Sequence, residues 1–89
     1  MRIRQSTRFK RDLKAARKRG LDMDLLDAVV DLLTKGVTLP SKYRDHPLVG
    51  NYSSFRECHI APDWLLIYRV EDGELVLYLF RTGTHSDLF

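Results

Sequence analysis

Two apolar runs separated by a short turn restrict the fold of this chain more than any other feature. Residues 64–70 and 75–82 are rich in leucine, β-branched and aromatic side chains, which is typical of strands. The turn between them contains Gly73, which can adopt the positive φ of a hairpin turn. Apolar residues occupy both faces of each run, so we expect both strands in the middle of a sheet, with helices over one face.

A third strand is expected directly before this hairpin, at residues 55–60, joined to it by the turn Ala61-Pro62-Asp63. Its residues alternate, with Arg56, Cys58 and Ile60 on one face and Phe55, Glu57 and His59 on the other. The three strands predict an antiparallel meander. Cys58 is the only cysteine and lies in mid-strand, so we interpret it as a small buried side chain and not as a nucleophile.

The N-terminal part predicts a short edge strand and a basic amphipathic helix. Residues 2–5 are expected to form the strand, with Ile3 facing the core. Ser6 or Thr7 can cap the helix that follows. Its apolar face consists of Phe9, Leu13 and Ala16, and Gly20 closes it.

A second helix is expected to follow after about two residues, which favours an antiparallel helical hairpin. Asp22 can cap this helix, and Gly36 ends it. Its expected buried stripe consists of Leu25, Leu26, Val29, Leu32 and Leu33. Residues 37–51 are interrupted by Pro40, Pro47 and Gly50, and we expect a connection that is too polar for the core but long enough to be functional.

These elements predict an α+β fold of one domain over residues 1–89, with a helical hairpin packed on a small, mainly antiparallel sheet. No apolar stretch reaches the roughly 20 residues of a membrane span. The N-terminus lacks the hydrophobic region of a secretory signal. We therefore expect a cytoplasmic protein without contact to a membrane.

Positive charge is concentrated at the N-terminus. Residues 1–19 carry nine of the fifteen basic residues and one acid, a net charge of +8, whereas the other seventy residues carry −5. Such a basic stripe favours a polyanion or an acidic protein as partner, and Lys10, Lys14 and Arg17 are its expected contacts. A solvated helix face is the simpler interpretation, but such faces usually interleave acids, and this segment has only Asp12.

Histidines lie at the ends of several expected elements. In an antiparallel meander, the end of the first strand, the start of the second and the end of the third share one edge of the sheet. This edge gathers His59, Asp63, Trp64, Arg81 and His85, and the connection that carries His46 can close over it. We interpret the group as a site.

The residue types fit the cleavage of RNA by internal transfer. Histidine can act as base or acid near neutral pH, and arginine offers donors that match phosphate oxygens. Trp64 and Phe89 offer flat faces to an unstacked base. Zinc binding by His46, His59, Asp63 and His85 is one alternative. A non-catalytic module that binds nucleic acid or protein through the basic helix is another.

Three sequence blocks carry a family resemblance. They are Asp45-His46-Pro47-Leu48-x-Gly50, then Arg56-Glu57-x-His59-x-x-Pro62-Asp63-Trp64-Leu65-Leu66-Ile67-Tyr68, and the C-terminal block from Arg81 to Phe89, which reads Arg-Thr-Gly-Thr-His-Ser-Asp-Leu-Phe. With the two-helix N-terminal part, they resemble the YafQ branch of the RelE superfamily, small bacterial toxins of toxin–antitoxin systems. The resemblance covers nearly the whole chain.

The resemblance implies an endoribonuclease that cuts messenger RNA in the ribosomal decoding site and needs no cofactor. The implied fold is a helical hairpin on a curved, mainly antiparallel sheet. His85 would be the general acid, Asp63 or His59 the base, and Arg81 the phosphate ligand. The implied partner is a cognate antitoxin, a small ribbon-helix-helix dimer through which alone promoter DNA would be bound. The implied site residues are His46, His59, Asp63, Arg81, His85 and Phe89, with Trp64 beside them.

Overall fold

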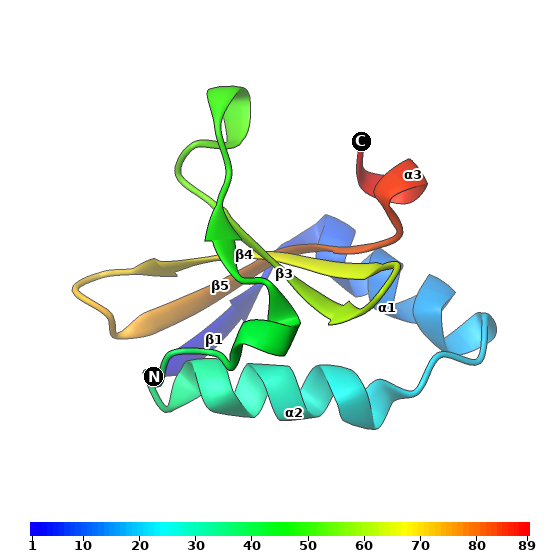
Figure 1. The fold of residues 1–89 in the computed structure, drawn as a ribbon, viewed down its shortest axis with the longest axis horizontal. Coiled ribbons are helices and arrows are strands. Elements are labelled where there is room, and N and C mark those ends of the chain that lie inside the picture. The colour runs from blue at the N-terminus through cyan, green and yellow to red at the C-terminus, as the bar shows by residue number, and fades with distance from the viewer.

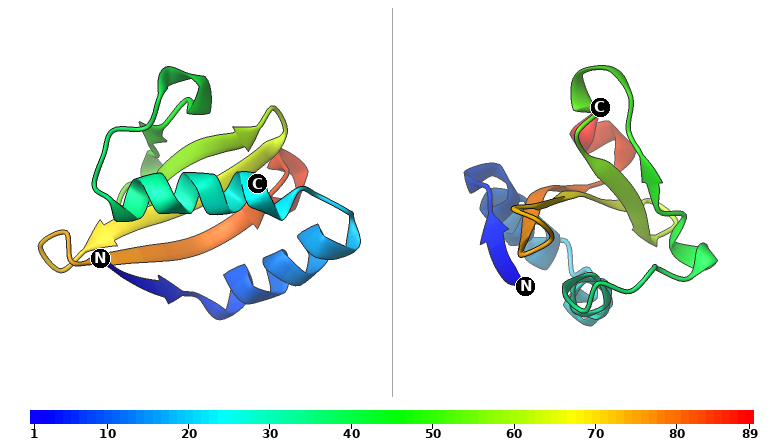
Figure 2. Two further views of the ribbon diagram at one scale, coloured as in Figure 1. Left: turned by 90° about the horizontal axis from the view of Figure 1, so that it is seen from below. Right: turned by 90° about the vertical axis from the view of Figure 1, so that its left-hand side faces the viewer.

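A five-stranded mixed sheet with two long helices on one face forms the protein (Figures 1 and 2). The computed structural model describes residues 1–89 without a gap. The strands are β1 (Arg2–Gln5), β2 (His46–Pro47), β3 (Arg56–Ala61), β4 (Trp64–Glu71) and β5 (Val76–Gly83). The helices are α1 (Thr7–Lys18), α2 (Met23–Thr34) and α3 (His85–Leu88), with short 3-10 turns η1 (Ser41–Tyr43) and η2 (Gly50–Tyr52).

The order of strands in the sheet is β1-β5-β4-β3-β2. Strand β1 runs parallel to β5, and every other neighbouring pair is antiparallel. The predicted fold class, the meander β3-β4-β5 and the edge position of β1 are therefore confirmed. Strands β4 and β5 lie in the middle, as their apolar faces predicted.

The core is divided by the sheet into two unequal clusters. The larger one lies under α1 and α2 and includes Phe9, Val29, Cys58, Leu66 and Leu77. The smaller one lies on the opposite face, where Leu65 and Ile67 pack with Leu88 of α3. Because apolar side chains are buried on both faces, β4 and β5 cannot shift their register by one residue without disrupting both clusters.

The two helices begin at the predicted caps. The Ser6 hydroxyl accepts a hydrogen bond from the Phe9 amide at 2.9 Å, and the Asp22 carboxylate accepts one from the Asp24 amide at 3.0 Å.

Two residues that were predicted to lie in the core are exposed, so these two predictions are wrong. Ile3 is 49% exposed because β1 is an edge strand, beside an open groove between β1, α1 and α2. Leu25 is 44% exposed because it turns toward a groove beside η1.

The segment before β3 is more ordered than its composition indicated. Leu39 is buried in the larger cluster, so the expectation that this segment stays out of the core is wrong at that residue. His46 and Pro47 form β2, with His46 opposite Glu57 of β3. The carboxylate of Asp45 accepts hydrogen bonds from Arg56 and from the Tyr68 hydroxyl, which fixes β2 against the sheet. A two-residue strand is too short to show an alternating pattern.

Cys58 has the predicted structural role. Its side chain is fully buried in the larger cluster, and this burial raises the pKa of the thiol to about 12. The reactive thiolate is therefore scarce at neutral pH. None of the helices combines the length and the apolar character that crossing a membrane requires.

Candidate active site

Two imidazoles and one carboxylate meet on the face of the sheet opposite α1 and α2. Glu57 points to this face from β3 because Cys58 beside it points into the larger cluster. Its carboxylate oxygen lies 3.3 Å from Nε2 of His46 and 3.8 Å from Nε2 of His59. Glu57 is 4% exposed, so its carboxylate lies beside both rings with little access to water. We call His46, Glu57 and His59 the histidine cluster.

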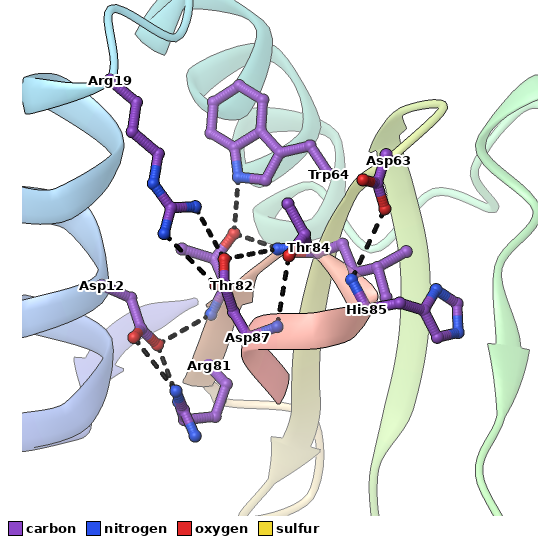
Figure 3. A network of polar contacts seen from close by, with 10 residues as sticks. Asp12, Arg19, Asp63, Trp64, Arg81, Thr82, Thr84, His85 and Asp87 are labelled. Atoms are coloured by element: carbon purple, nitrogen blue, oxygen red, sulfur yellow. Dashed lines mark hydrogen bonds and ion pairs between the residues drawn. The ribbon is translucent and has the colours of Figure 1, made fainter. Parts of the chain in front are cut away.

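A second group is built on the short helix α3, which carries His85 at its first residue. Thr84 caps the helix: its hydroxyl accepts from the Asp87 amide at 3.2 Å, and the Asp87 carboxylate accepts from the Thr84 amide at 2.9 Å. The His85 amide donates to Asp63 at 3.5 Å. The imidazole of His85 is exposed and points away from these contacts (Figure 3).

Helix α1 holds this group in place from the side. Arg19, which follows α1, makes a two-pronged ion pair with Asp87, at 2.7 and 3.2 Å (Figure 3). Asp12 of α1 pairs in the same way with Arg81, at 2.8 and 3.2 Å, and also accepts from the Thr82 amide. The position of His85 therefore depends on residues nearly seventy positions earlier in the chain.

The sheet register brings the two groups to one end of the sheet. His59 lies opposite Leu65, and Leu65 lies opposite Gly83, two residues before His85. The predicted gathering of His59, Asp63 and the end of β5 at one edge is therefore confirmed. Within it, the contacts join His59 to His46 and join Asp63 to His85.

The predicted stacking role of Trp64 is wrong. Its indole is 4% exposed and belongs to the larger cluster under the helices, so no base can reach it. The indole Nε1 donates to the Thr82 hydroxyl at 2.9 Å, which itself donates to the Leu65 carbonyl. Trp64 thus fixes β5 against β4. Phe89, in contrast, is 56% exposed, and its ring centre lies 5.7 Å from that of His85.

Three acids at the site were not among the predicted functional residues. Glu57 stands two residues before His59, and this spacing on a strand places both on one face, so the pattern could have indicated it. Asp12 and Asp87 gave no such signal, because their partners are Arg81 and Arg19, far away in sequence.

The histidine cluster also has the composition of a metal site. Its three ligand atoms lie within 4.8 Å of one another, and two imidazoles with a carboxylate suit zinc or copper. The four-ligand site considered from the sequence is not formed, because Asp63 and His85 do not belong to this cluster. Only His46 and His59 belong both to the zinc site considered from the sequence and to the histidine cluster.

The predicted basic contacts on α1 are accessible. Lys10, Lys14 and Arg17 are exposed and take part in no ion pair, whereas Arg19 is bound to Asp87. The first three recur at intervals of four and three residues, so they share one side of the helix.

Replacing Asp87 with asparagine is expected to weaken the acid dependence of stability. The hydrogen bonds from Arg19, and secondly from the Thr84 amide, hold the pKa of the Asp87 carboxyl well below its ordinary value of 3.8. The carboxylate therefore stabilises the fold above pH 3.8, and this contribution is lost as the pH falls toward the lowered pKa. The free energy of unfolding in urea, measured from pH 7 to pH 3, should fall less steeply in Asp87→Asn.

Asp31→Asn is the matched control, since the Asp31–Lys35 ion pair is open to solvent. Its stability should follow the pH dependence of the wild type. An Asp87→Asn protein with an unchanged acid dependence would contradict the role of this carboxylate.

The whole chain is similar to known proteins. A family model described as "Bacterial toxin of type II toxin-antitoxin system, YafQ" matches residues 1–89. The chain belongs to this family. The mRNA interferase toxin YafQ of Escherichia coli K12 is 42% identical over 88 residues, which cover 98% of this chain and 94% of that protein.

Solved structures of family members have the same fold. The E. coli DinJ-YafQ toxin-antitoxin complex contains a chain that superposes with a TM-score of 0.88 at 42% identity, over 98% of this chain and 94% of that one. A metal-bound toxin from Helicobacter pylori superposes with a TM-score of 0.92 at 46% identity, over 100% and 99% of the two chains. The predicted type II toxin is confirmed, and the name of the E. coli relative agrees with the predicted endoribonuclease activity.

Proposed function

We propose that this chain cuts messenger RNA on ribosomes by attack of the RNA's own 2′-oxygen, and so stops translation. The observation that carries the proposal is the placement of His85. Its imidazole is exposed on a firmly held helix, at the end of the sheet where the histidine cluster also lies. Two separate acid–base groups at one place are what internal transfer requires.

Each group has one role in the proposed reaction. His85 donates a proton to the departing 5′-oxygen, because its exposed imidazole is open to an RNA strand at this end of the sheet. His59 takes the proton of the 2′-hydroxyl, supported by the carboxylate of Glu57 at 3.8 Å. Asp63 is the other possible base, but its carboxylate already accepts from the His85 amide. His46 is held by Glu57 beside this base.

Arg81 supplies positive charge to the phosphate in this mechanism. The ion pair with Asp12 raises the pKa of its guanidinium and holds the group in one orientation. Asp12 takes the N–H of Nε and one N–H of Nη2, so both N–H groups of Nη1 and the second one of Nη2 are left for phosphate oxygens. A fixed donor stabilises developing charge without having to reorient during the reaction.

Other residues are proposed to bind the substrate and the partner. Phe89 offers its exposed ring to a base beside the cut. Lys10, Lys14 and Arg17 are proposed to contact ribosomal RNA. Because the E. coli relative is found in a complex with DinJ, we infer a cognate antitoxin here, with any contact to promoter DNA made through it.

A direct test is the fate of message on programmed ribosomes. The purified chain should cut ribosome-bound message, leaving a 2′,3′-cyclic phosphate and a 5′-hydroxyl. Reversing Lys10, Lys14 and Arg17 together to Glu should weaken ribosome binding. It should also make the negative slope of log affinity against log salt shallower, by about one for each lost phosphate contact. The charge-preserving variant Lys10→Arg, Lys14→Arg, Arg17→Lys is the control and should bind like the wild type.

A module that only binds would also lose affinity on charge reversal, so cleavage separates the two functions. Uncut message on ribosomes that are saturated with the wild-type chain would support the binding module. Cleavage that keeps its rate in the charge-reversed variant would show that α1 is not the ribosome contact.

A further inference from the structure

An unbroken row of aromatic rings crosses the open face of the sheet. It runs from Phe89 to Tyr52, then to Phe80 and Phe55, and ends at Tyr78. The ring centres of successive members lie 5.9, 6.5, 4.5 and 6.4 Å apart, in that order. We call these five residues the aromatic row. It combines side chains from the C-terminus, η2, β5 and the residue directly before β3.

The two ends of the row differ in chemistry. At one end Phe89 lies beside His85. At the other, the guanidinium of Arg69 lies 4.6 Å from the ring centre of Phe55, and that of Arg4 lies 4.0 Å from the ring centre of Tyr78. A guanidinium plane can carry an unstacked base, as an aromatic ring can. The row thus leads from His85, the proposed general acid, to the guanidinium planes of Arg69 and Arg4.

The row covers a small core but is itself accessible. Phe55 and Phe80 pack on the buried Leu65 and Ile67. Phe89 is exposed, and the other four rings are partly exposed. Helices α1 and α2 lie on the opposite face of the sheet (Figure 2), and the only helix on the face of the row is the short α3, whose Leu88 packs on Leu65 and Ile67. Neighbouring rings on an open face, next to a nuclease site, have the arrangement of a stacking platform for single-stranded RNA.

We propose that the aromatic row binds the RNA nucleotides downstream of the cut. This inference rests on the proposed endoribonuclease function. His85 gives its proton to the 5′-oxygen of the departing strand, so the first downstream nucleotide must lie at His85. Phe89 touches His85, and the row leads away from there. The strand that leaves the reaction therefore follows the row, with its bases against the exposed rings and, at the far end, against the guanidinium planes of Arg4 and Arg69.

Charge also favours RNA over an apolar protein segment. Arg4 and Arg69 share the carboxylate of Glu71, at 2.7 and 2.6 Å, so these three side chains carry one excess positive charge. A groove between β1, α1 and α2 lies elsewhere on the molecule and is lined mostly by apolar residues. Phe9, Leu13 and Val30 form part of its wall. An apolar helix of a partner would fit that groove better than the row.

Tyr78→Leu tests the row at its far end, away from the residues assigned to chemistry. Leucine keeps apolar cover over the sheet but removes the flat ring, and Tyr78→Phe keeps the ring as the matched control. On programmed ribosomes we expect Tyr78→Leu to raise KM about fivefold to a hundredfold with kcat unchanged, the range found for removing one stacked base. Tyr78→Phe should behave like the wild type. Circular dichroism spectra that match the wild type show that both variants are folded.

Crosslinking identifies the occupant directly. Messages that carry 4-thiouridine at single positions downstream or upstream of the cut are bound on ribosomes and irradiated. Crosslinks to the row from downstream positions, lost in Tyr78→Leu and kept in Tyr78→Phe, would support the proposal. Crosslinks only from upstream positions would overturn it.

The test separates this inference from the proposed function. If the wild type cuts message and Tyr78→Leu keeps the wild-type KM, the row is not an RNA platform, although the endoribonuclease stands. If Tyr78→Leu keeps the wild-type KM but binds the cognate antitoxin more weakly, the row is a protein interface. A wild-type chain that leaves message intact would refute the proposed function, and the row with it.

Discussion

Replacing His85 with alanine is expected to slow cleavage of ribosome-bound message by about 10²–10⁴-fold, the contribution typical of a general acid. The 5′-oxygen would then leave without a proton, which raises the barrier of the bond-breaking step. Binding should be nearly unchanged, because Phe89 and the basic face of α1 remain. The measurement is single-turnover cleavage on programmed ribosomes with the variant at saturation.

The fold should survive this substitution. The contact from His85 to Asp63 is made by the backbone amide, and the capping box uses Thr84 and Asp87, so none of these contacts requires the imidazole. Ser86→Ala changes the next, exposed residue of α3 and is the matched control, with wild-type cleavage expected. A folded His85→Ala protein that cuts at the wild-type rate would show that another group protonates the leaving oxygen.

A single 2′-deoxy substitution at the cut position is expected to abolish cleavage there. Internal transfer uses the 2′-oxygen of the substrate as nucleophile, so removing this atom removes the reaction. Binding should persist, because contacts to phosphate and stacked bases do not depend on that hydroxyl. The measurement compares ribose and deoxyribose messages on ribosomes, with cut and uncut message resolved by electrophoresis.

The same experiment separates internal transfer from metal-assisted hydrolysis. The histidine cluster has suitable ligands for a metal ion, and a metal-bound hydroxide would attack the phosphate without the 2′-oxygen. Each message is therefore also tested with a chelator that spares the magnesium of the ribosome. We expect cleavage of the ribose message alone, with or without chelator. Cleavage of the deoxy message, or loss of activity with the chelator, would replace the acid–base mechanism by a metal-dependent one.

The sequence by itself determined the local elements and the middle of the sheet. Ser6 and Asp22 cap the helices as their residue types predicted, and the two apolar runs became β4 and β5. These features depend on neighbours within a few residues, or on how many faces of a strand must be buried. The connectivity of a meander also predicted that His59 and the end of β5 would share one edge.

The tertiary structure decided which predicted residues can do chemistry. Trp64 and Phe89 look alike in sequence as possible stacking surfaces, but the indole is buried under the helices and the terminal ring is exposed. Strand β2 places His46 beside Glu57, and α1 clamps α3 through Arg19 and Asp87. Pairs of charged groups that are distant in sequence form only when packing has brought their elements together, so no local pattern contains them. Periodicity and caps therefore determined the scaffold, and long-range packing determined the site.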